Sequence, residues 1–332
     1  MIYNYLLKKR NFLLIFFFYS QYIQGQTLLP TAENAFEIQL PFNKKYISDH
    51  KIKSIIFDII DKKDLQVAED KGLLNYYEFN KMGQLTRFYY TVISKIIQKE
   101  FYQPSTYSKR HKINNAYTYT KNDYIFDTVS SVYFYNEKNN LILKRNNDGI
   151  FYESYYYDYD SQLKINKERR CKETNVSPLK NEFKLGSQLI ISQESFSYTA
   201  TGKNQVKKIC FNDENRPYKE MIFNFNEANQ ILSIDEHYVV AWITQKYTFE
   251  YNGTHQLIKA IYTSNSNGLQ TTVKTFEYDS NNCLLTEKHY KNDVLLKEIS
   301  YITDADKKIT SYLIRDPKEK NIRIIKLYYN YY

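Results

Sequence analysis

The stretch Tyr77-Glu-Phe79-Asn80-Lys-Met-Gly83-Gln-Leu85 contains a phrase that recurs along this chain of 332 residues. The phrase is an aromatic residue, any residue, a second aromatic residue, Asn or Asp, and then Leu or Ile five positions after that Asn or Asp. Four further copies keep this spacing, and they begin at Tyr133, Phe223, Phe249 and Phe276. Five copies with one spacing indicate a structural repeat.

Each copy is typical of a β-hairpin. Aromatic residues at positions i and i+2 lie on the same face of a strand. The Asn or Asp that follows accepts a hydrogen bond from the backbone two residues on and begins a turn. Three residues after it stands Gly or Asn, the types that best tolerate a left-handed backbone, at Gly83, Asn139, Asn215, Asn229 and Asn282. We expect the Leu or Ile to open the return strand.

Three copies are less regular. The copy from Tyr157 to Leu163 predicts a turn two residues shorter, and the copies at Ile209-Cys-Phe211-Asn212 and Tyr301-Ile-Thr303-Asp304 are degraded. His255 and Lys307 depart from the Gly or Asn rule at the left-handed position. The gap of 56 residues from Phe79 to Tyr135 is about two periods and predicts a decayed copy between them.

A second hairpin is predicted within each period. Its turns are expected at Asn146–Gly149, Ser264–Gly268 and Lys291–Asp293, and two strands fit the spacing of 25–27 residues between later copies. We therefore predict an all-β fold, an antiparallel hairpin meander that forms one long curled sheet or partial shell. The repeat domain is expected over residues 76–332, after an N-terminal segment, 26–75, with a first strand at Lys51–Ile60.

The phrase resembles the YD repeats of RHS-type bacterial secreted and surface proteins, in which a Tyr-Asp pair precedes a Gly-containing turn and a Leu. The clearest matches are Tyr77–Leu85 and Phe276–Leu284, and the resemblance spans roughly residues 76–310. Here Asn mostly replaces Asp, and most turns lack the Gly. The resemblance implies strands laid side by side in a curled sheet or shell, outside the cell and sometimes associated with carbohydrate.

The first 25 residues are typical of a signal peptide. Lys8, Lys9 and Arg10 precede the apolar run from Phe12 to Tyr19, which is too short to span a bilayer as a helix. A polar stretch then leads to a predicted cleavage site near Gly25 and Gln26. The alternatives are a membrane anchor or a buried N-terminal strand. The resulting prediction is export to the periplasm, the cell surface or the medium of a bacterium.

The composition favours strands and argues against nucleic acid as a partner. The chain has 35 Tyr and 20 Phe but only 8 Gly and 6 Pro, although an AT-rich genome would also enrich Tyr and Phe. Removal of residues 1–25 lowers the formal charge from +9 to +6, which is modest for a chain of this length. Because the three cysteines are an odd number, at least one is unpaired within the chain.

The sequence contains no local motif for catalysis, metal or cofactor binding. The five histidines form no HxxxH or HExxH pattern, and neither a phosphate-binding loop nor a nucleophile elbow is present. No catalytic residue, metal ligand or cofactor is predicted, and an enzyme is the less favoured class. A hydrolase with a site assembled by the fold remains open.

Tyrosine side chains are the candidate binding groups. The segment Phe151–Tyr159 places Tyr152, Ser154 and Tyr156 on one strand face. Aromatic rings supply rigid, amphipathic contact area, so Tyr152 and Tyr156 are the predicted binding residues; packing within the sheet is the alternative role. Basic runs within residues 96–125 and 164–186 are predicted to be loops, as solvated charge or as a docking patch for an acidic polymer.

Three functions are compatible with these features. The first is an exported non-catalytic β-repeat protein that binds a glycan or a protein partner at the cell envelope. The second is a structural or scaffold subunit of a surface assembly, and the third is the hydrolase. The last strand, Ile322–Tyr332, is expected to be either buried or an exposed edge that recruits a partner. The oligomeric state is left open.

Overall fold

A computed structural model describes residues 26–63, 65–103, 117–147, 151–179, 182–266 and 268–332. The predicted signal peptide, residues 1–25, lies outside the described residues. Within those ranges the chain forms one short helix, α1 (Lys44–Asp49), and 18 strands. None of the described helical structure is long and apolar enough to traverse a bilayer.

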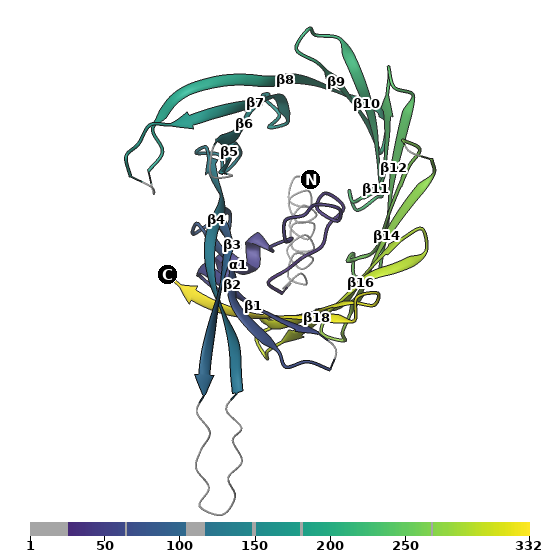
Figure 1. Cartoon of the computed structure of the whole chain (residues 1–332). Coiled ribbons are helices and arrows are strands. Elements are labelled where there is room, and N and C mark those ends of the chain that lie inside the picture. The colour runs from purple at the N-terminus through teal and green to yellow at the C-terminus, as the bar shows by residue number, and fades with distance from the viewer. Residues whose placement is uncertain (1–25, 64, 104–116, 148–150, 180–181, 267) are drawn as a thin grey trace, which may run out of the picture.

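The strands follow one another around a closed barrel (Figure 1). The first half comprises β1 (Ile52–Lys63), β2 (Glu69–Phe79), β3 (Leu85–Gln103), β4 (Tyr117–Tyr135), β5 (Leu141–Asn147), β6 (Tyr152–Tyr159), β7 (Ile165–Asn175), β8 (Leu185–Gly202) and β9 (Gln205–Phe211). The second half comprises β10 (Pro217–Phe225), β11 (Ile231–Tyr238), β12 (Ile243–Tyr251), β13 (Leu257–Ser264), β14 (Gln270–Tyr278), β15 (Leu284–Lys291), β16 (Val294–Thr303), β17 (Ile309–Asp316) and β18 (Asn321–Tyr331).

The predicted antiparallel meander is confirmed, but the open curled sheet or partial shell is wrong. Every strand pairs antiparallel with its neighbours in sequence, and β18 pairs with β1 from Ile52↔Tyr331 to Lys63↔Asn321. This last ladder closes the sheet. The C-terminal strand is therefore not an exposed edge, because β17 covers its other side. Closure removes free edges, which would otherwise be sites for unwanted strand pairing.

The predicted turn is found at every copy of the phrase. In the first copy, the side-chain Oδ1 of Asn80 accepts hydrogen bonds from the backbone N–H groups of Met82 and Gln84, each at 3.0 Å. Gly83 has a φ of 72°, and its N–H donates to the carbonyl of Asn80 at 2.9 Å. The four Asn residues predicted to be left-handed have φ values of 58–62°.

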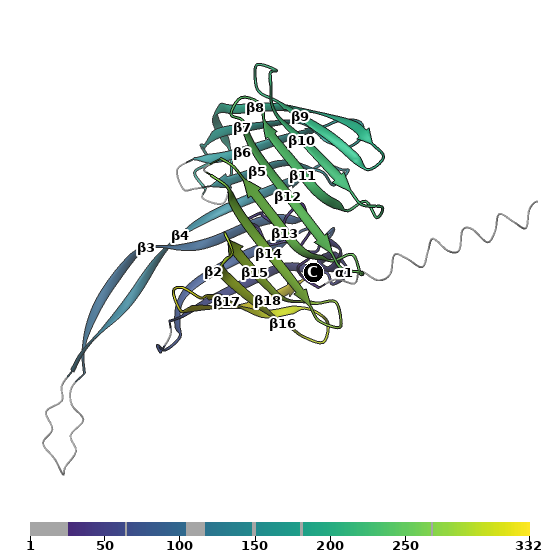
Figure 2. The same cartoon turned by 90° about the vertical axis from the view of Figure 1, so that its right-hand side faces the viewer.

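Three details of the repeat differ from the prediction. The turn after Tyr159 is of normal length, because Leu163 takes the left-handed position with a φ of 63° and Ile165 opens β7. His255 and Lys307 also adopt φ values of 65° and 61°. The 56-residue gap holds no decayed copy, since β3 and β4 are 19 residues each and form one long hairpin that projects from the barrel (Figure 2).

The basic stretches are not the predicted loops. The run from Lys164 to Asn175 contains the whole of β7, whose residues alternate between the two faces of the sheet. In the other stretch, residues 96–103 and 117–125 belong to β3 and β4. The most basic part of that stretch, residues 107–115, lies outside the described residues.

The second aromatic residue of the phrase joins consecutive repeats. Its hydroxyl group, where it is Tyr, donates to the carbonyl of the residue that opens the return strand of the preceding repeat. The distance is 2.8 Å in four cases: Tyr135 to Leu85, Tyr159 to Leu141, Tyr251 to Ile231 and Tyr278 to Leu257. The repeat phrase thus determines its own turn and also provides a contact to the preceding hairpin.

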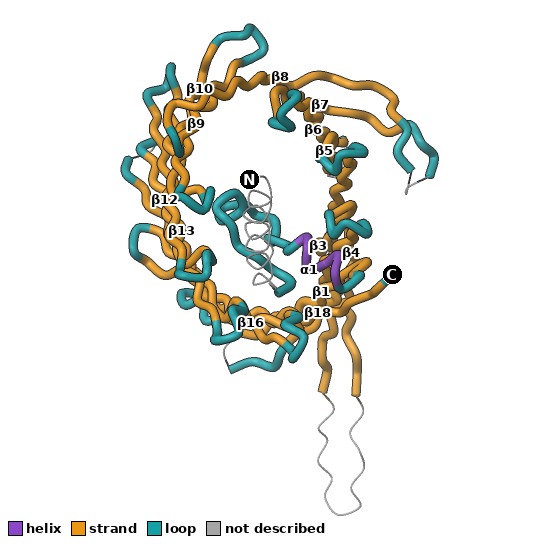
Figure 3. Tube along the Cα trace, turned by 180° about the vertical axis from the view of Figure 1, so that it is seen from behind, coloured by secondary structure: helices purple, strands orange, loops and turns teal. Residues whose placement is uncertain are grey.

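Residues 26–51 form a plug inside the barrel (Figures 1 and 3). Its side chains Leu28, Ala35 and Ile47 are buried against inward-facing residues of the wall, such as Phe57 and Phe276. The helix α1 is capped by Asn43, whose side chain accepts from the N–H of Tyr46 at 3.2 Å. The plug and the wall therefore share one hydrophobic core.

Hydrogen bonds fix the plug to the rim that carries most repeat turns. Tyr46 donates to the carbonyl of Asp306 at 2.8 Å, and Ser48 donates to that of Lys81 at 2.8 Å. A Cβ atom at Gly83 would lie 1.9 Å from the carbonyl oxygen of Lys44, at the start of α1. Both its φ and this close approach explain why the first repeat has Gly where most others have Asn.

Substitution at the left-handed position should change stability in opposite directions at two sites. We expect Leu163→Gly to stabilise the fold by about 0.5–1 kcal/mol. A left-handed backbone costs a residue with a Cβ atom about 1–2 kcal/mol, and the greater conformational entropy that Gly loses on folding offsets part of this gain. Gly83→Asn should destabilise it, because its Cβ would clash with α1. Urea unfolding curves measure both effects, and a stable Gly83→Asn variant would contradict the packing argument.

The inter-repeat hydroxyl groups should contribute measurably to stability. Tyr278→Phe removes the hydrogen bond to Leu257 and should cost about 1 kcal/mol. Phe225 occupies the equivalent position but has no hydroxyl, and the same geometry would aim a Tyr there at the carbonyl of Pro217. Phe225→Tyr is therefore the matched gain-of-contact variant, and equal unfolding midpoints for all three proteins would refute the role of the hydroxyl.

Candidate functional site

The predicted binding residues Tyr152 and Tyr156 lie on the outer face of β6, in a cluster centred on Glu173. Tyr156 donates its hydroxyl proton to Glu173 Oε1 at 2.5 Å, and Ser154 donates to Oε2 at 2.5 Å. Arg145 Nε also donates to Oε2 at 2.9 Å. Glu173 is fully buried and Arg145 is 8% exposed, so this is a desolvated ion pair with additional donors.

The rings of both tyrosines already have partners. The guanidinium carbon of Arg169 lies 5.1 Å from the centre of the Tyr156 ring. Tyr152 packs edge-on against Phe183, with 4.8 Å between ring centres. The alternation predicted for β6 is confirmed, since Tyr152, Ser154 and Tyr156 share one face. Their surroundings favour a structural role for this face of the strand.

The groups that donate hydrogen bonds to the Glu173 carboxylate favour its charged form. Burial acts to raise the pKa of the carboxyl, but hydrogen bonds from Ser154, Tyr156 and Gln188 and the charge of Arg145 outweigh it, so the pKa lies below its usual range. A carboxyl group whose pKa is lower in the folded state than in the unfolded state stabilises the protein at pH values above its unfolded-state pKa. That stabilisation is lost as the pH falls through the folded-state value. The sequence contains only a weak signal for this pair, an Arg and a Glu in polar strands that are separated by one intervening strand.

Removal of one partner of this ion pair should cost more than removal of both. Glu173→Gln or Arg145→Met alone leaves a buried, uncompensated group, and each should destabilise the fold by about 3–5 kcal/mol. The double variant should lose less unfolding free energy than the two single variants lose in sum. Denaturant unfolding in a double-mutant cycle measures the coupling, and strictly additive losses would contradict it.

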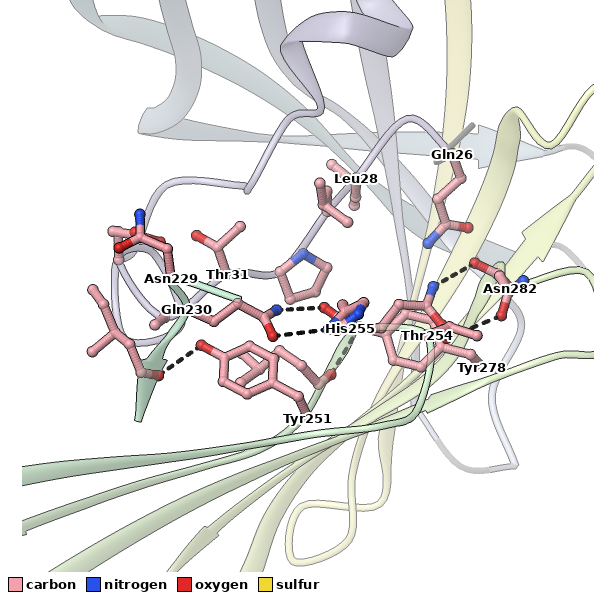
Figure 4. Close-up of a pocket in the computed structure, with 17 residues that line it drawn as sticks. Gln26, Leu28, Thr31, Asn229, Gln230, Tyr251, Thr254, His255, Tyr278 and Asn282 are labelled. Carbon is pink, nitrogen blue, oxygen red and sulfur yellow. Dashed lines mark hydrogen bonds between the residues drawn. The ribbon is translucent and has the colours of Figure 1, made fainter. Parts of the chain in front are cut away.

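A pocket lies at the barrel rim, between the plug and the repeat turns (Figure 4). We call it the rim pocket, and it is a cavity of about 260 Å³. One side is the plug segment from Leu28 to Glu33, and the other comprises the turns near Gln230, Thr254 and Asn282 with the rings of Tyr251 and Tyr278. Its volume is near the lower end for pockets that hold small ligands.

The polar groups of the rim pocket are mostly neutral. Gln230 Nε2 donates to the carbonyl of His255 at 2.8 Å, and Gln256 Nε2 donates to that of Asn282 at 2.9 Å. These bonds join adjacent turns and hold the amides in place. Burial raises the pKa of Tyr251 to about 12, so its hydroxyl group stays protonated.

Gln26 is the least satisfied group of the rim pocket. Its side chain extends from the plug into the pocket and is 3% exposed (Figure 4). Its Oε1 atom has no hydrogen-bond partner among the described residues. A buried carbonyl oxygen without a donor is unfavourable, so a ligand hydroxyl or N–H group would gain affinity there. The sequence contained no signal for this pocket, because the plug and the turns are about 200 residues apart.

A second group of polar side chains faces the plug from β14–β16. Tyr301 donates to Glu287 Oε2 at 2.9 Å, and His289 contacts Oε1. Lys274 Nζ lies 3.8 Å from the same Oε1. Burial opposes the charge of Glu287, but the hydrogen bond and charge of His289 and the charge of Lys274 lower its pKa. These contacts explain a buried carboxylate, and within the described residues no group of His, Cys, Asp or Glu forms a metal site.

The outer wall of the barrel carries ion pairs between neighbouring strands. Examples are Lys207–Glu220 at 2.9 Å, Lys246–Asp235 at 3.3 Å, Lys259–Glu250 at 3.3 Å and Lys288–Glu277 at 3.4 Å. These residues alternate with the inward-facing aromatic residues, and they extend from β9 to β15. A barrel wall that faces lipid is an apolar band, whereas this stretch of wall is typical of contact with water.

Comparison with known proteins identifies no family. No family model matches the chain, and no curated protein matches it. Among solved structures, a porin-like protein from Bacteroides uniformis ATCC 8492 aligns at 9% identity with a TM-score of 0.36, over 85% of this chain and 97% of that one. A porin-like protein from Bacteroides vulgatus ATCC 8482 aligns at 8% identity with a TM-score of 0.32, over 84% of this chain and 98% of that one. Both scores are too low to support an argument about this chain.

Proposed function

We propose that this chain is an exported, non-catalytic β-barrel that binds a glycan in the rim pocket, in the periplasm or at the cell surface. The observation that carries this proposal is the chemistry of the pocket. Neutral amides and hydroxyl groups match sugar hydroxyls, which both donate and accept, and the tyrosine rings provide an amphipathic surface. The unpartnered Oε1 of Gln26 supplies a position for a ligand donor.

Two further observations support the proposal. The repeat turns resemble YD repeats, and that resemblance implies an extracellular and sometimes carbohydrate-associated protein. The charged outer wall from β9 to β15 is compatible with a barrel that is surrounded by water, either free or attached to other envelope components. A protein partner in place of the glycan, or a scaffold role, is the alternative.

A hydrolase is the remaining alternative, and one observation bears on it. Glu37 and Glu287 line one cavity of about 260 Å³ beside the plug. Desolvation raises the pKa of Glu37, whereas that of Glu287 is lowered. Opposite shifts are typical of an acid and base pair. However, both oxygens of Glu287 already have protein partners, which favours a structural role.

The binding proposal predicts a specific pattern among three variants. Residues 26–332 are tested against the polysaccharide and protein fractions of the envelope, and then by calorimetry with oligosaccharides from the retained fraction. Gln26→Leu should weaken binding about tenfold, which corresponds to roughly 1.4 kcal/mol for a lost hydrogen bond. Glu33→Gln should have no effect, because a neutral sugar does not require that charge.

Tyr152→Ala is the matched control, since Tyr152 lies on the outer face of β6 and does not line the rim pocket. Loss of binding in this variant and not in Gln26→Leu would place the site at the outer cluster and overturn the rim-pocket proposal. Retention by the protein fraction alone would favour the protein partner. Release of reducing sugar during incubation, abolished by Glu37→Gln, would favour the hydrolase.

A further inference from the structure

Strand β8 extends beyond its neighbour in the closed barrel. Residues 185–195 of β8 pair with β7, but β9 pairs with β8 only from Ser195 to Gly202. Among the described residues, the backbone of 185–194 therefore has no ladder on its other side. Figures 1 and 3 show the β7–β8 hairpin reaching past the wall of the barrel. This segment is therefore a free sheet edge, as are the projecting parts of β3 and β4, which pair only with each other.

The free edge is apolar and exposed. The exposed fractions are 66% for Leu189, 52% for Ile190 and 48% for Ile191. Residues 185–193 contain no charged residue and no Pro. Proteins usually protect an exposed edge with Lys, with Pro or with a bulge. One register shift in the β7–β8 ladder, beside Cys171, places a bulge at Ile191, and it changes the local twist without adding charge.

The other projecting hairpin shows the usual protection. The arm formed by β3 and β4 also extends from the barrel (Figure 2). It carries Lys95 and Lys99 on one strand and Lys121 and Asp123 on the other, with an ion pair between Lys99 and Asp123. The same chain therefore protects one exposed hairpin with charge and leaves the other without it, which makes the β8 edge a candidate interface.

The sequence of the edge indicates what would cover it. An open row of backbone N–H and C=O groups is matched by another extended strand. The seven residues Ser187-Gln-Leu-Ile190-Ile-Ser-Gln193 have the same polarity pattern in both directions, polar, polar, apolar, apolar, apolar, polar, polar. In an antiparallel pair centred on Ile190, apolar residues would face apolar ones and polar residues would face polar ones. Because the segment is uncharged, two copies would not repel each other.

We propose that residues 185–193 of β8 pair antiparallel with the same segment of a second copy of this chain, across a two-fold axis near Ile190. Such a contact is self-complementary and closes a dimer. The interface is small, because a stable dimer usually buries at least about 1,000 Å². The association should therefore be weak, with a dissociation constant in roughly the micromolar range.

Analytical ultracentrifugation of residues 26–332 between about 1 and 100 µM tests the proposal, since this range brackets a micromolar constant. We expect a concentration-dependent dimer that Ile190→Lys abolishes and that Ile96→Lys, a matched change on the β3–β4 arm, leaves intact. Both side chains are exposed, at 52% and 54%, so both variants should fold. A wild-type protein that is monomeric throughout, or a dimer that persists in Ile190→Lys, overturns the proposal.

Cysteine cross-linking tests the geometry. Ile190→Cys places a thiol on the two-fold axis opposite its own copy, where opposed Cα atoms of an antiparallel pair are about 4.5–5.5 Å apart and within reach of a disulfide. In the same register position 189 faces position 191 of the second copy, so Leu189→Cys pairs with Ile191→Cys. We expect Ile190→Cys alone, and an equimolar mixture of Leu189→Cys and Ile191→Cys, to give a covalent dimer under mild oxidation. Ile96→Cys should not, and the three native cysteines are buried. Cross-linking at Ile96 alone would contradict the proposed edge.

Discussion

Where the second aromatic residue of the repeat is Tyr, its hydrogen bond to a carbonyl of the preceding repeat sets how one hairpin lies against the next. A turn alone fixes the register of its own two strands, because the Asn or Asp cap and the left-handed residue determine which residues face each other. The hydroxyl of Tyr251 or Tyr278 extends this control to the preceding hairpin. With each hairpin held in a fixed register against the preceding one, the sheet curves in one direction. The face that carries the repeat aromatic residues then points inward.

Closure and the plug depend on this inward face. An 18-strand barrel is too wide for its own wall residues to fill, because barrel diameter grows with the number of strands. The segment from Leu28 to α1 occupies part of the interior and buries aromatic residues such as Phe57 and Phe249. The ladder between β1 and β18 then joins the residues that follow the plug to the end of the chain. The N-terminal segment is thus part of the core.

The sequence predicted the local features better than the global ones. The turn at Asn80 and the strand face shared by Tyr152 and Tyr156 follow from patterns within ten residues, and both are confirmed. Closure depends on pairing between residues about 270 positions apart, for which the sequence contains no periodic signal. The sequence misplaces Leu163, because the other copies have Leu or Ile where the return strand opens, whereas here Leu163 takes the left-handed position of the turn and Ile165 opens β7.

The candidate sites were harder to predict for a related physical reason. The rim pocket requires Gln26 to meet Tyr278, and the outer cluster requires Arg145 to meet Glu173 across two intervening ladders. Each residue looks ordinary in its own segment. The pairing of β5, β6 and β7 brings Arg145 to Glu173, and the position of the plug inside the barrel brings Gln26 to Tyr278. The free edge of β8 is different, because it arises where the strand lengths of a closed sheet do not match. The β3–β4 arm also leaves strand edges unpaired but carries charged residues along them. The uncharged edge of β8 is instead a surface on which backbone pairing, independent of any pocket, can recruit another chain.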